Sequence, residues 1–287
     1  MHIKAGQKLE CALYVVATPI GNLSDITLRA LEVLAAAGTI AAEDTRNTRH
    51  LLKHHGIGDA RLLAMHQHNE RAAAERIIGL LRQGEPVALV TDAGTPAVSD
   101  PGALLVEAVR EAGFRVIPIP GASAAITALS ASGLGAPHFL FYGFLPNKSA
   151  ARRSVLQSLA GHPYTMVFYE APHRILECTE DLHAVFGGER DIVFAREITK
   201  LFESIHRCKL GEASAWLNSD PNNQRGEFVL LVSGAQIKEG LDADAERVLK
   251  VLLEELPLKQ AVQLAAQITG VARNDLYQHA LSLKSAE

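Results

Sequence analysis

The stretch TDAGTPAVSDPG, residues Thr91–Gly102, breaks a regular alternation of strand and helix. The apolar run Pro86–Val90 before it predicts a buried strand, and Ala103–Val109 after it has helical spacing. The stretch holds two glycines, two prolines and two aspartates. It is longer than the roughly two to six residues of an ordinary strand-to-helix connection. Because open α/β sheets bind ligands at the carboxyl ends of their strands, we expect a ligand-binding loop here.

The first half of the chain alternates strands with helices around this loop. Predicted strands lie at residues 11–17, 39–42, 61–65, 86–91 and 115–119. Helical patterns fill the intervals, the first capped by Ser24 or Asp25, and a helix of small residues follows Gly121. This alternation predicts an α/β fold with a parallel, doubly wound sheet.

The second half has a different pattern. Strand candidates lie at residues 139–143, 164–169, 191–195, 203–208 and 227–232, and the last three have fewer helices between them. We therefore expect a second α/β domain that mixes parallel and antiparallel pairs. The last part reads as helical, with a turn at Gly270. The predicted domains are residues 11–133, residues 134–240 and a helical tail of residues 241–287.

Composition narrows the class of protein. The chain has 287 residues, of which 48% are hydrophobic and 21% charged, as in an ordinary globular protein. Its net charge of -4 argues against non-specific coating of nucleic acid, although it allows a local basic cleft. No apolar run reaches the about 18 residues of a membrane span, and the N-terminus lacks a signal-peptide core. Three widely spaced cysteines suggest a reducing compartment, so we expect a cytoplasmic protein.

Several common catalytic motifs are missing from the sequence. It contains no G-x-G-x-x-G after the first strand, no phosphate-binding G-x-x-x-x-G-K-[ST] and no G-x-S-x-G elbow. The pairs His54–His55 and His66–His68 lack partners at metal-ligand spacing, so we expect no metal.

Loops at the carboxyl ends of the predicted strands have a shared character. Gly21, Gly94 and Gly121 allow close approach of the backbone to a ligand, and nearby prolines fix the shape of the loops. Since these strand ends face one side of a doubly wound fold, the loops should surround a single cleft. There are six such loops, at residues 18–23, 43–46, 91–102, 120–124, 169–174 and 196–200.

Five of these segments carry a family resemblance. The sequences TPIGNL (18–23), AEDTR (42–46), TDAGTP (91–96), FYEAPHR (168–174) and AREITK (195–200) resemble the ribosomal RNA branch of the tetrapyrrole-methylase-like, class III S-adenosylmethionine-dependent methyltransferases. The resemblance runs from about Leu13 to the C-terminus. It implies two α/β domains with S-adenosylmethionine bound between them, and a homodimer. The implied reaction is 2′-O-methylation of a cytidine in the decoding region of 16S rRNA, in the small ribosomal subunit.

The resemblance and the loop pattern together assign residues to the methyl donor. The set is Pro19, Ile20, Asp92, Gly94, Thr95, Val98, Ser123, Ala124 and Tyr169. Asp92 is expected to shape its loop or contact the donor, and Asp100 to cap the following helix. Small-molecule members of the family typically have G-x-G-[DE] and G-D-P where this chain has Pro-Ile-Gly-Asn and Gly-Thr-Pro. This departure leaves the role of Thr95 open.

Charged residues at the cleft suggest how a ribose hydroxyl could be activated. Methyl transfer needs alignment of donor and acceptor, and a base or a cation assists loss of the hydroxyl proton. One carboxylate among Glu43, Asp44 and Glu170 is expected to help deprotonation. Arg46 or Lys200 is expected to hold phosphate or the developing oxyanion. In the alternative interpretation, Asp44–Arg46 and Glu197–Lys200 are local ion pairs.

Two basic groups and the tail are candidates for RNA contact. One group is Arg46, Arg49, His50, Lys53, His54 and His55, and the other is Lys148, Arg152 and Arg153. Either is also typical of a solvated helix face. The tail resembles a helix-turn-helix but would equally serve as a packing cap. Two other functions stay open from the sequence: a small-molecule tetrapyrrole methylase, and a non-catalytic ribosome-assembly factor.

Overall fold

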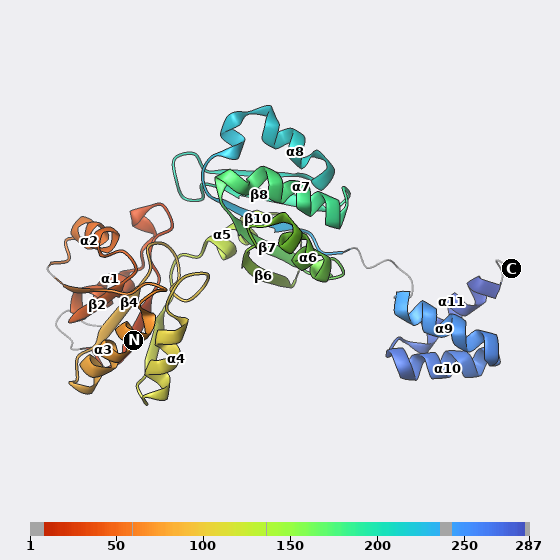
Figure 1. Cartoon of the computed structure of the whole chain (residues 1–287), viewed down its shortest axis with the longest axis horizontal. Helices are drawn as coiled ribbons and strands as arrows, with labels where there is room; N and C mark the ends of the chain where they lie inside the picture. The colour runs from red at the N-terminus through yellow and green to blue at the C-terminus, as the bar shows by residue number, and fades with distance from the viewer. Residues whose placement is uncertain (1–8, 59, 136, 236–242, 285–287) are drawn as a thin grey trace. The chain divides into compact units, whose positions relative to one another are not determined.

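The computed structural model describes residues 9–58, 60–135, 137–235 and 243–284 (Figure 1). The chain forms two compact units, residues 1–234 and 235–287. The predicted boundary between residues 240 and 241 lies outside the described residues. Within those residues no helix has the length and apolar character needed to cross a membrane.

The first sheet is parallel throughout, as predicted. Its strands run in the order β3-β2-β4-β1-β5, with bounds Leu13–Val16 (β1), Thr39–Ala42 (β2), Arg61–Ala64 (β3), Val87–Val90 (β4) and Val116–Ile119 (β5). In β1, Leu13 pairs with Val87 on one side and Val116 on the other. Strands β2 and β4 are buried along their whole length because helices cover both faces.

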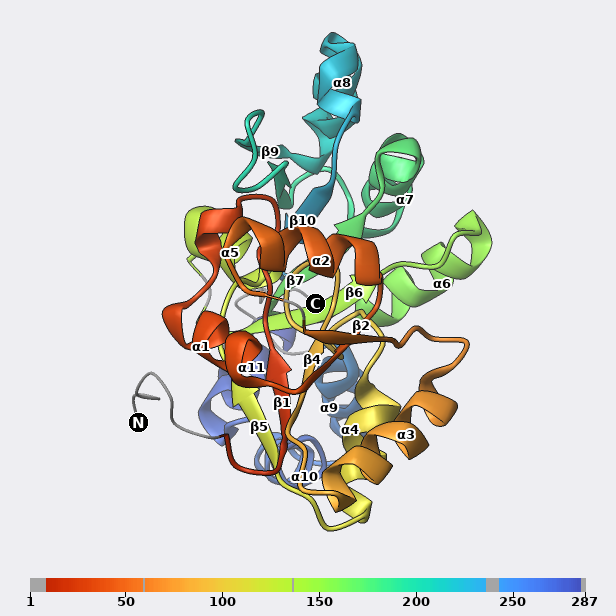
Figure 2. The same cartoon turned by 90° about the vertical axis from the view of Figure 1, so that its left-hand side faces the viewer.

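The helices divide between the two faces of this sheet. Leu28–Ala36 (α1) and Thr45–His54 (α2) pack on one face, and Glu70–Arg82 (α3) and Ala103–Glu111 (α4) pack on the other (Figure 2). Strands β1 and β4 are neighbours, yet β1 leads into α1 and β4 leads into α4. The loops that follow these strands therefore diverge, which makes this pair the topological switch point of the sheet.

Two predicted helix caps are wrong. Ser24 and Asp25 belong to a 3-10 turn, Leu23–Asp25 (η1), and α1 begins after Thr27, whose Oγ1 accepts from the N–H of Ala30 at 3.2 Å. Asp100 does not cap α4. The buried carboxylate of Glu70 accepts instead from the N–H groups of Gly102 and Leu105, at 3.0 and 3.2 Å. Glu70, which lies 32 positions before Gly102 in the chain, thus replaces the local cap.

The second sheet mixes parallel and antiparallel pairs, as predicted. Its order is β6-β7-β10-β8-β9, and β6 and β7 form its parallel pair. The strands are Phe139–Phe144 (β6), Thr165–Glu170 (β7), Asp191–Arg196 (β8), Ser204–Lys209 (β9) and Phe228–Val232 (β10). One face is covered by Ser149–Leu159 (α6), Ile175–Phe186 (α7) and Leu210–Ser219 (α8). Two 3-10 turns, Pro172–Arg174 (η2) and Pro221–Gln224 (η3), complete this half.

The other face of the second sheet is covered by a helix from the preceding part of the chain. Ala124–Ala131 (α5) follows β5 of the first sheet, but its Ala125 and Ala128 pack with Val167, Val193 and Val229 of the second (Figure 1). The crossing therefore occurs before α5, at residues 120–123, and the loop after β5 lies where the two sheets meet.

The second compact unit is a three-helix bundle. Its helices are Ala243–Glu255 (α9), Leu258–Thr269 (α10) and Arg273–Lys284 (α11), and they enclose Leu249, Val262 and Leu276. Gly270 ends α10 in the left-handed conformation, with φ of 73° and its N–H bonded to the carbonyl of Ala266. This is the turn that the sequence predicts.

Candidate functional site

A cavity of about 360 Å³ lies among the strand-end loops of the two sheets. Seven of the residues predicted to contact the donor line it: Ile20, Gly94, Thr95, Val98, Ser123, Ala124 and Tyr169. Glu170 and Lys200, two of the predicted catalytic residues, line it as well. Five of the six predicted cleft loops, from both halves, thus converge on one space, and the loop at residues 43–46 contributes no residue to its lining.

Pro19 and Asp92 lie elsewhere. Both line a second, smaller pocket of about 190 Å³ together with residues from α2. Thr18 and Gly94 separate the two spaces: the N–H of Thr18 donates to the carbonyl of Gly94 at 2.8 Å, and the N–H of Gly94 donates back at 3.1 Å. The loops after β1 and β4 are thereby joined into one wall at the switch point. Ile20 and Gly94 border the large cavity, and Pro19 and Asp92 border the small pocket.

Backbone strain is concentrated at the large cavity. Among the described residues, four that are not glycine have positive φ: Ala97 (67°), Ser99 (64°), Glu197 (50°) and Thr199 (67°). The first two lie in the loop after β4, and the others lie in the loop after β8, which contributes Ile198 to the cavity wall. Side chains other than glycine avoid this region unless the surroundings hold them there, and such strain clusters at functional sites.

Contacts between the two halves explain part of this strain. Within the second half, the Tyr169 hydroxyl accepts from the N–H of Ala125 at 3.3 Å, which fixes the start of α5 on β7 directly after the chain crosses. Ser99 packs against Gly143 of β6. A Cβ added at Gly143 would stand 2.7 Å from Ser99 Oγ, and the φ of Gly143 is 81°. A register shift in β6 between Phe141 and Gly143 accompanies this approach. The loop after β4 is held against the second sheet.

Asp100 is a cavity residue that sequence reasoning missed. It lines the large cavity, and its pKa is raised to about 6, first by burial and then by the negative charge of Glu43. The sequence predicts Asp100 as the cap of α4, because an aspartate just before a helix ordinarily caps that helix. The sequence feature that indicates a cavity position for Asp100 is its place in the long loop after β4, which is predicted to bind a ligand.

Two of the predicted catalytic acids lie at the edge of the small pocket. Glu43 Oε2 accepts from the Thr91 hydroxyl at 2.7 Å. Asp44 caps α2 through the N–H of Arg46 and forms an ion pair with that guanidinium at 2.6 Å. The hydrogen bonds from Arg46 lower the pKa of Asp44 to about 2. The structure therefore contains the local Asp44–Arg46 ion pair of the alternative interpretation.

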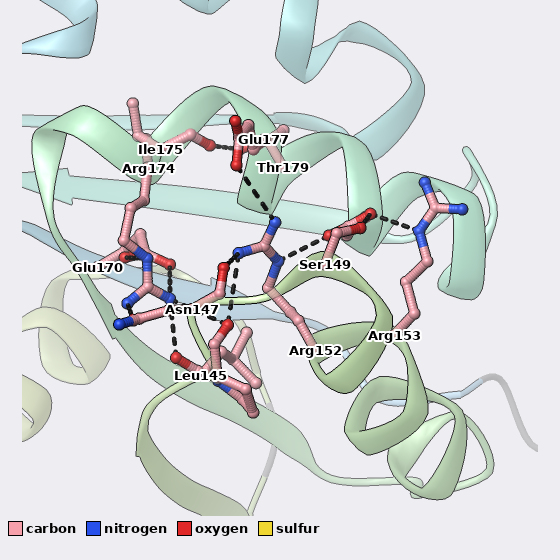
Figure 3. A network of polar contacts seen from close by, with 12 residues as sticks. Leu145, Asn147, Ser149, Arg152, Arg153, Glu170, Arg174, Ile175, Glu177 and Thr179 are labelled. Atoms are coloured by element: carbon pink, nitrogen blue, oxygen red, sulfur yellow. Dashed lines mark hydrogen bonds and ion pairs between the residues drawn. The ribbon is translucent and has the colours of Figure 1, made fainter.

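Glu170 and Lys200 are also paired. Glu170 has a fully buried side chain, and its Oε1 lies 3.1 Å from Arg174 Nε (Figure 3). Lys200 Nζ lies 2.9 Å from Glu197 Oε1 and 2.7 Å from Glu227 Oε2. Burial lowers the pKa of Lys200, but the hydrogen bonds to Glu227 and Glu197 outweigh it and raise the pKa. Both side chains are therefore held in place at the cavity wall.

A buried polar network supports this wall from behind. Arg152, from α6, is fully buried and donates through Nε to Asp181 of α7 at 2.7 Å (Figure 3 shows its surroundings). Arg174 donates to the carbonyl of Leu145 at 2.7 Å and to the side chain of Asn147. The expected RNA contact by Arg152 is wrong because water and RNA cannot reach it. Its charge instead joins α6 to α7.

No group of three or more histidine, cysteine or acidic side chains in the described part of the chain could hold a metal ion.

Sequence comparisons identify the family. A profile for the Tetrapyrrole (Corrin/Porphyrin) Methylases matches residues 12–214, and one for the RsmI C-terminal HTH domain matches residues 239–284. The chain is 54% identical over 270 residues to Ribosomal RNA small subunit methyltransferase I of Escherichia coli O157:H7, covering 94% of each. It is 55% identical over 272 residues to the protein of the same name from Pseudomonas aeruginosa, covering 94% of this chain and 96% of the relative.

The chain belongs to the ribosomal RNA small subunit methyltransferase I family. The resemblance drawn from the strand-end loops is therefore confirmed. The match of the tail to the helix-turn-helix profile supports the helix-turn-helix interpretation of the tail, which stays a prediction.

Solved structures share the fold of the first compact unit. The methyltransferase CobJ is 23% identical with a TM-score of 0.59, over 78% of this chain and 94% of that one. Uroporphyrin-III C-methyltransferase from Thermus thermophilus, complexed with S-adenosyl homocysteine, is 17% identical with a TM-score of 0.54. That likeness covers 77% of this chain and 97% of the other. The tetrapyrrole methylase-like fold predicted from the sequence is confirmed.

The buried ion pair behind the cavity wall gives a prediction about stability. Replacing Asp181 with Ala leaves Arg152 charged and buried, so we expect a loss of about 3 kcal/mol in the free energy of unfolding. Chemical denaturation followed by circular dichroism measures this loss. The control Glu180→Ala, at an exposed position of the same helix, should change stability by less than about 0.5 kcal/mol. The pair Arg152→Met with Asp181→Leu should recover much of the loss; equal losses in the single and double variants would contradict the argument.

Proposed function

We propose that the protein transfers a methyl group from S-adenosylmethionine to the 2′-hydroxyl of a cytidine in the decoding region of 16S rRNA, in the small ribosomal subunit. The observation that carries the proposal is the cavity at the switch point, built from loops of both sheets in a chain of this methyltransferase family. Its site of action would be the cytoplasm, where ribosomal subunits assemble. We also propose a homodimer, on the family resemblance alone; the mass in solution tests it.

The large cavity suits the methyl donor in shape and charge. Ile20 and Val98 provide apolar wall, and Gly94, with φ of 84°, brings backbone close to the ligand. The Asp100 carboxylate suits the positive charges of the donor, and the first turn of α5 at Ala124 offers backbone N–H groups to its carboxylate. When bound, S-adenosylmethionine supplies a methyl group on a positively charged sulfur, and the carbon–sulfur bond breaks toward sulfur as the oxygen–carbon bond forms.

Among the predicted bases, Glu43 fits best. Asp44 is neutralised by Arg46, and Glu170 by Arg174. Glu43 has no cationic partner among the ion pairs of the described residues, and its side chain accepts a hydrogen bond from a neutral hydroxyl, that of Thr91. Its charge also acts on Asp100 in the large cavity. We assign to Glu43 the acceptance of the ribose hydroxyl proton, with the remaining rate enhancement coming from alignment.

RNA contacts are assigned to the exposed basic residues of α2 and to the tail. Arg46, Arg49 and Lys53 are exposed on α2, next to the small pocket. Lys200 is occupied by two carboxylates, which favours the α2 residues for phosphate contact. In the tail, Arg273 begins the last helix directly after the Gly270 turn and is exposed. The start of the second helix is where helix-turn-helix proteins contact nucleic acid.

The reaction is tested by transfer of labelled methyl to small ribosomal subunits from cells that lack this enzyme. We expect one label per subunit, on ribose rather than base after nuclease digestion. Arg273→Glu should raise KM for subunits about tenfold and leave donor affinity unchanged. Label on a porphyrinogen instead of RNA would indicate a tetrapyrrole methylase. Donor binding without any transfer would indicate an assembly factor.

Asp100 predicts a pH-dependent donor affinity. The ionised carboxylate attracts the cationic donor, and its pKa of about 6 in the free protein means that a falling pH protonates it. Affinity should therefore be fully present near pH 7 and fall as the pH goes from 7 to 5. Calorimetry measures this. Asp100→Asn should bind about tenfold more weakly at pH 7 and lose the pH dependence; a variant that keeps the wild-type slope would overturn the assignment.

Glu43→Gln tests the proposed base. The amide keeps the size of the side chain and still accepts from Thr91, but it cannot take a proton. We expect the single-turnover rate at saturating donor to fall about 100-fold, with donor affinity unchanged. Glu107→Gln, at an exposed position of α4, is the control. If the Glu43 variant retains the wild-type rate, solvent takes the proton and alignment alone accounts for catalysis.

A further inference from the structure

The small pocket of about 190 Å³ is separate from the large cavity that we assign to the methyl donor. It lies on the opposite side of the Thr18–Gly94 wall from the large cavity. Its lining comes from the loops after β1 and β4 and from the first two turns of α2. Among the residues that line it are Thr18, Asn47, Thr48, His50, Thr91 and Asp92.

The hydroxyl groups of this pocket are committed as donors to the protein itself. Thr18 Oγ1 donates to the carbonyl of Thr91 at 3.1 Å, and Thr91 Oγ1 donates to Glu43 at 2.7 Å. Thr48 Oγ1 donates to the carbonyl of Asp44 at 3.2 Å. Each hydroxyl can therefore offer a ligand only its lone pairs. With the acidic side chain of Asp92, the pocket presents mainly acceptors and suits a ligand group that carries N–H donors.

Asp92 is fixed in place with acceptor capacity to spare. Its Oδ1 accepts from the N–H of Asp44 at 3.1 Å, and Asn47 also hydrogen-bonds to it. A carboxylate has about four acceptor sites, so these bonds leave room for another donor. Asp92 is also solvent-exposed, which leaves it within reach of a ligand.

The rim of the pocket has the opposite charge. Arg46, Arg49 and Lys53 are exposed on α2, the helix that supplies Asn47 and His50 to the lining. An isolated amine or metal cation would meet this positive rim on its way in. A nucleotide satisfies both parts, because its phosphates suit the rim and the amino group of its base suits the acceptors inside.

We propose that the small pocket binds the base of the target nucleotide and that Asp92 accepts a hydrogen bond from its exocyclic amine, which selects cytosine over uracil. The inference rests on the proposed RNA methylation and specifies the substrate end of that reaction. Cytosine places an amino group where uracil has a carbonyl oxygen, and that oxygen would face the carboxylate unfavourably. His50 supplies a ring N–H toward the base. The target nucleotide must be unstacked to enter, which agrees with recognition of single-stranded RNA.

The test uses small subunits reconstituted with either cytidine or uridine at the methylated position. Wild type should prefer cytidine by at least about 100-fold in kcat/KM. Asp92→Asn still accepts from the N–H of Asp44 but offers an amide donor to uracil. We expect its cytidine-to-uridine ratio to fall at least about tenfold, with the Kd for S-adenosylmethionine unchanged. Asp25→Asn, at an exposed position of η1 outside both pockets, should keep the wild-type ratio.

Each other outcome decides against the inference or against its premise. An unchanged ratio in Asp92→Asn, with wild type selective, overturns the assignment and leaves RNA methylation intact. A wild type that methylates both subunits equally also overturns it. A wild type that methylates neither refutes the proposed function itself. If Asp92→Asn fails to fold by circular dichroism, His50→Ala decides: a KM for cytidine subunits raised severalfold supports the pocket, and an unchanged KM overturns it.

Discussion

The paired hydrogen bonds between Thr18 and Gly94 are the constraint on which both binding spaces depend. Strands β1 and β4 are neighbours whose chains then leave toward helices on opposite faces of the sheet. Left alone, their loops would separate. The two backbone bonds, with the Thr18 hydroxyl held by Thr91, join them into a wall with the large cavity on one side and the small pocket on the other. Sheet topology, rather than any one side chain, sets this division.

The second half of the molecule completes the large cavity through strained but well-supported loops. Ser99 keeps its positive φ where Gly143 gives it room, and Thr199 keeps its own where its N–H donates to Glu203 at 2.6 Å. Within the second half, Tyr169 links β7 to the start of α5. Strain that the surroundings hold in this way fixes loop shape before any ligand arrives, which lowers the ordering cost of binding.

The sequence predicts the architecture well because strand, loop and helix are local signals. Glycines, prolines and apolar runs locate the parallel sheet, the mixed sheet, the Gly270 turn and most of the cavity lining. Prediction from the sequence fails where a residue far away in the chain takes the place expected of a local one. Glu70 caps α4 from another helix, so Asp100 lines the cavity instead. Arg152 of α6 is buried in an ion pair with Asp181 of α7. Pro19 and Asp92 line a different pocket from their loop neighbours Ile20 and Gly94 because Thr18 pairs with Gly94. The spacing of residues in the sequence does not predict this pairing.

The distribution of carboxylates connects these features to the reaction. Asp181, Glu170 and Asp44 each have an arginine partner. Three other acids, at positions 43, 92 and 100, have no cationic partner among the ion pairs of the described residues, and the negative charges of the first two raise the pKa of Asp100. Such a group of like charges is unfavourable until a cation or N–H donors arrive. Of these three acids, Asp100 lines the large cavity, and its carboxylate favours a positively charged sulfonium over the neutral thioether that remains after methyl transfer. The charge that helps bind the donor thus weakens the hold on the product.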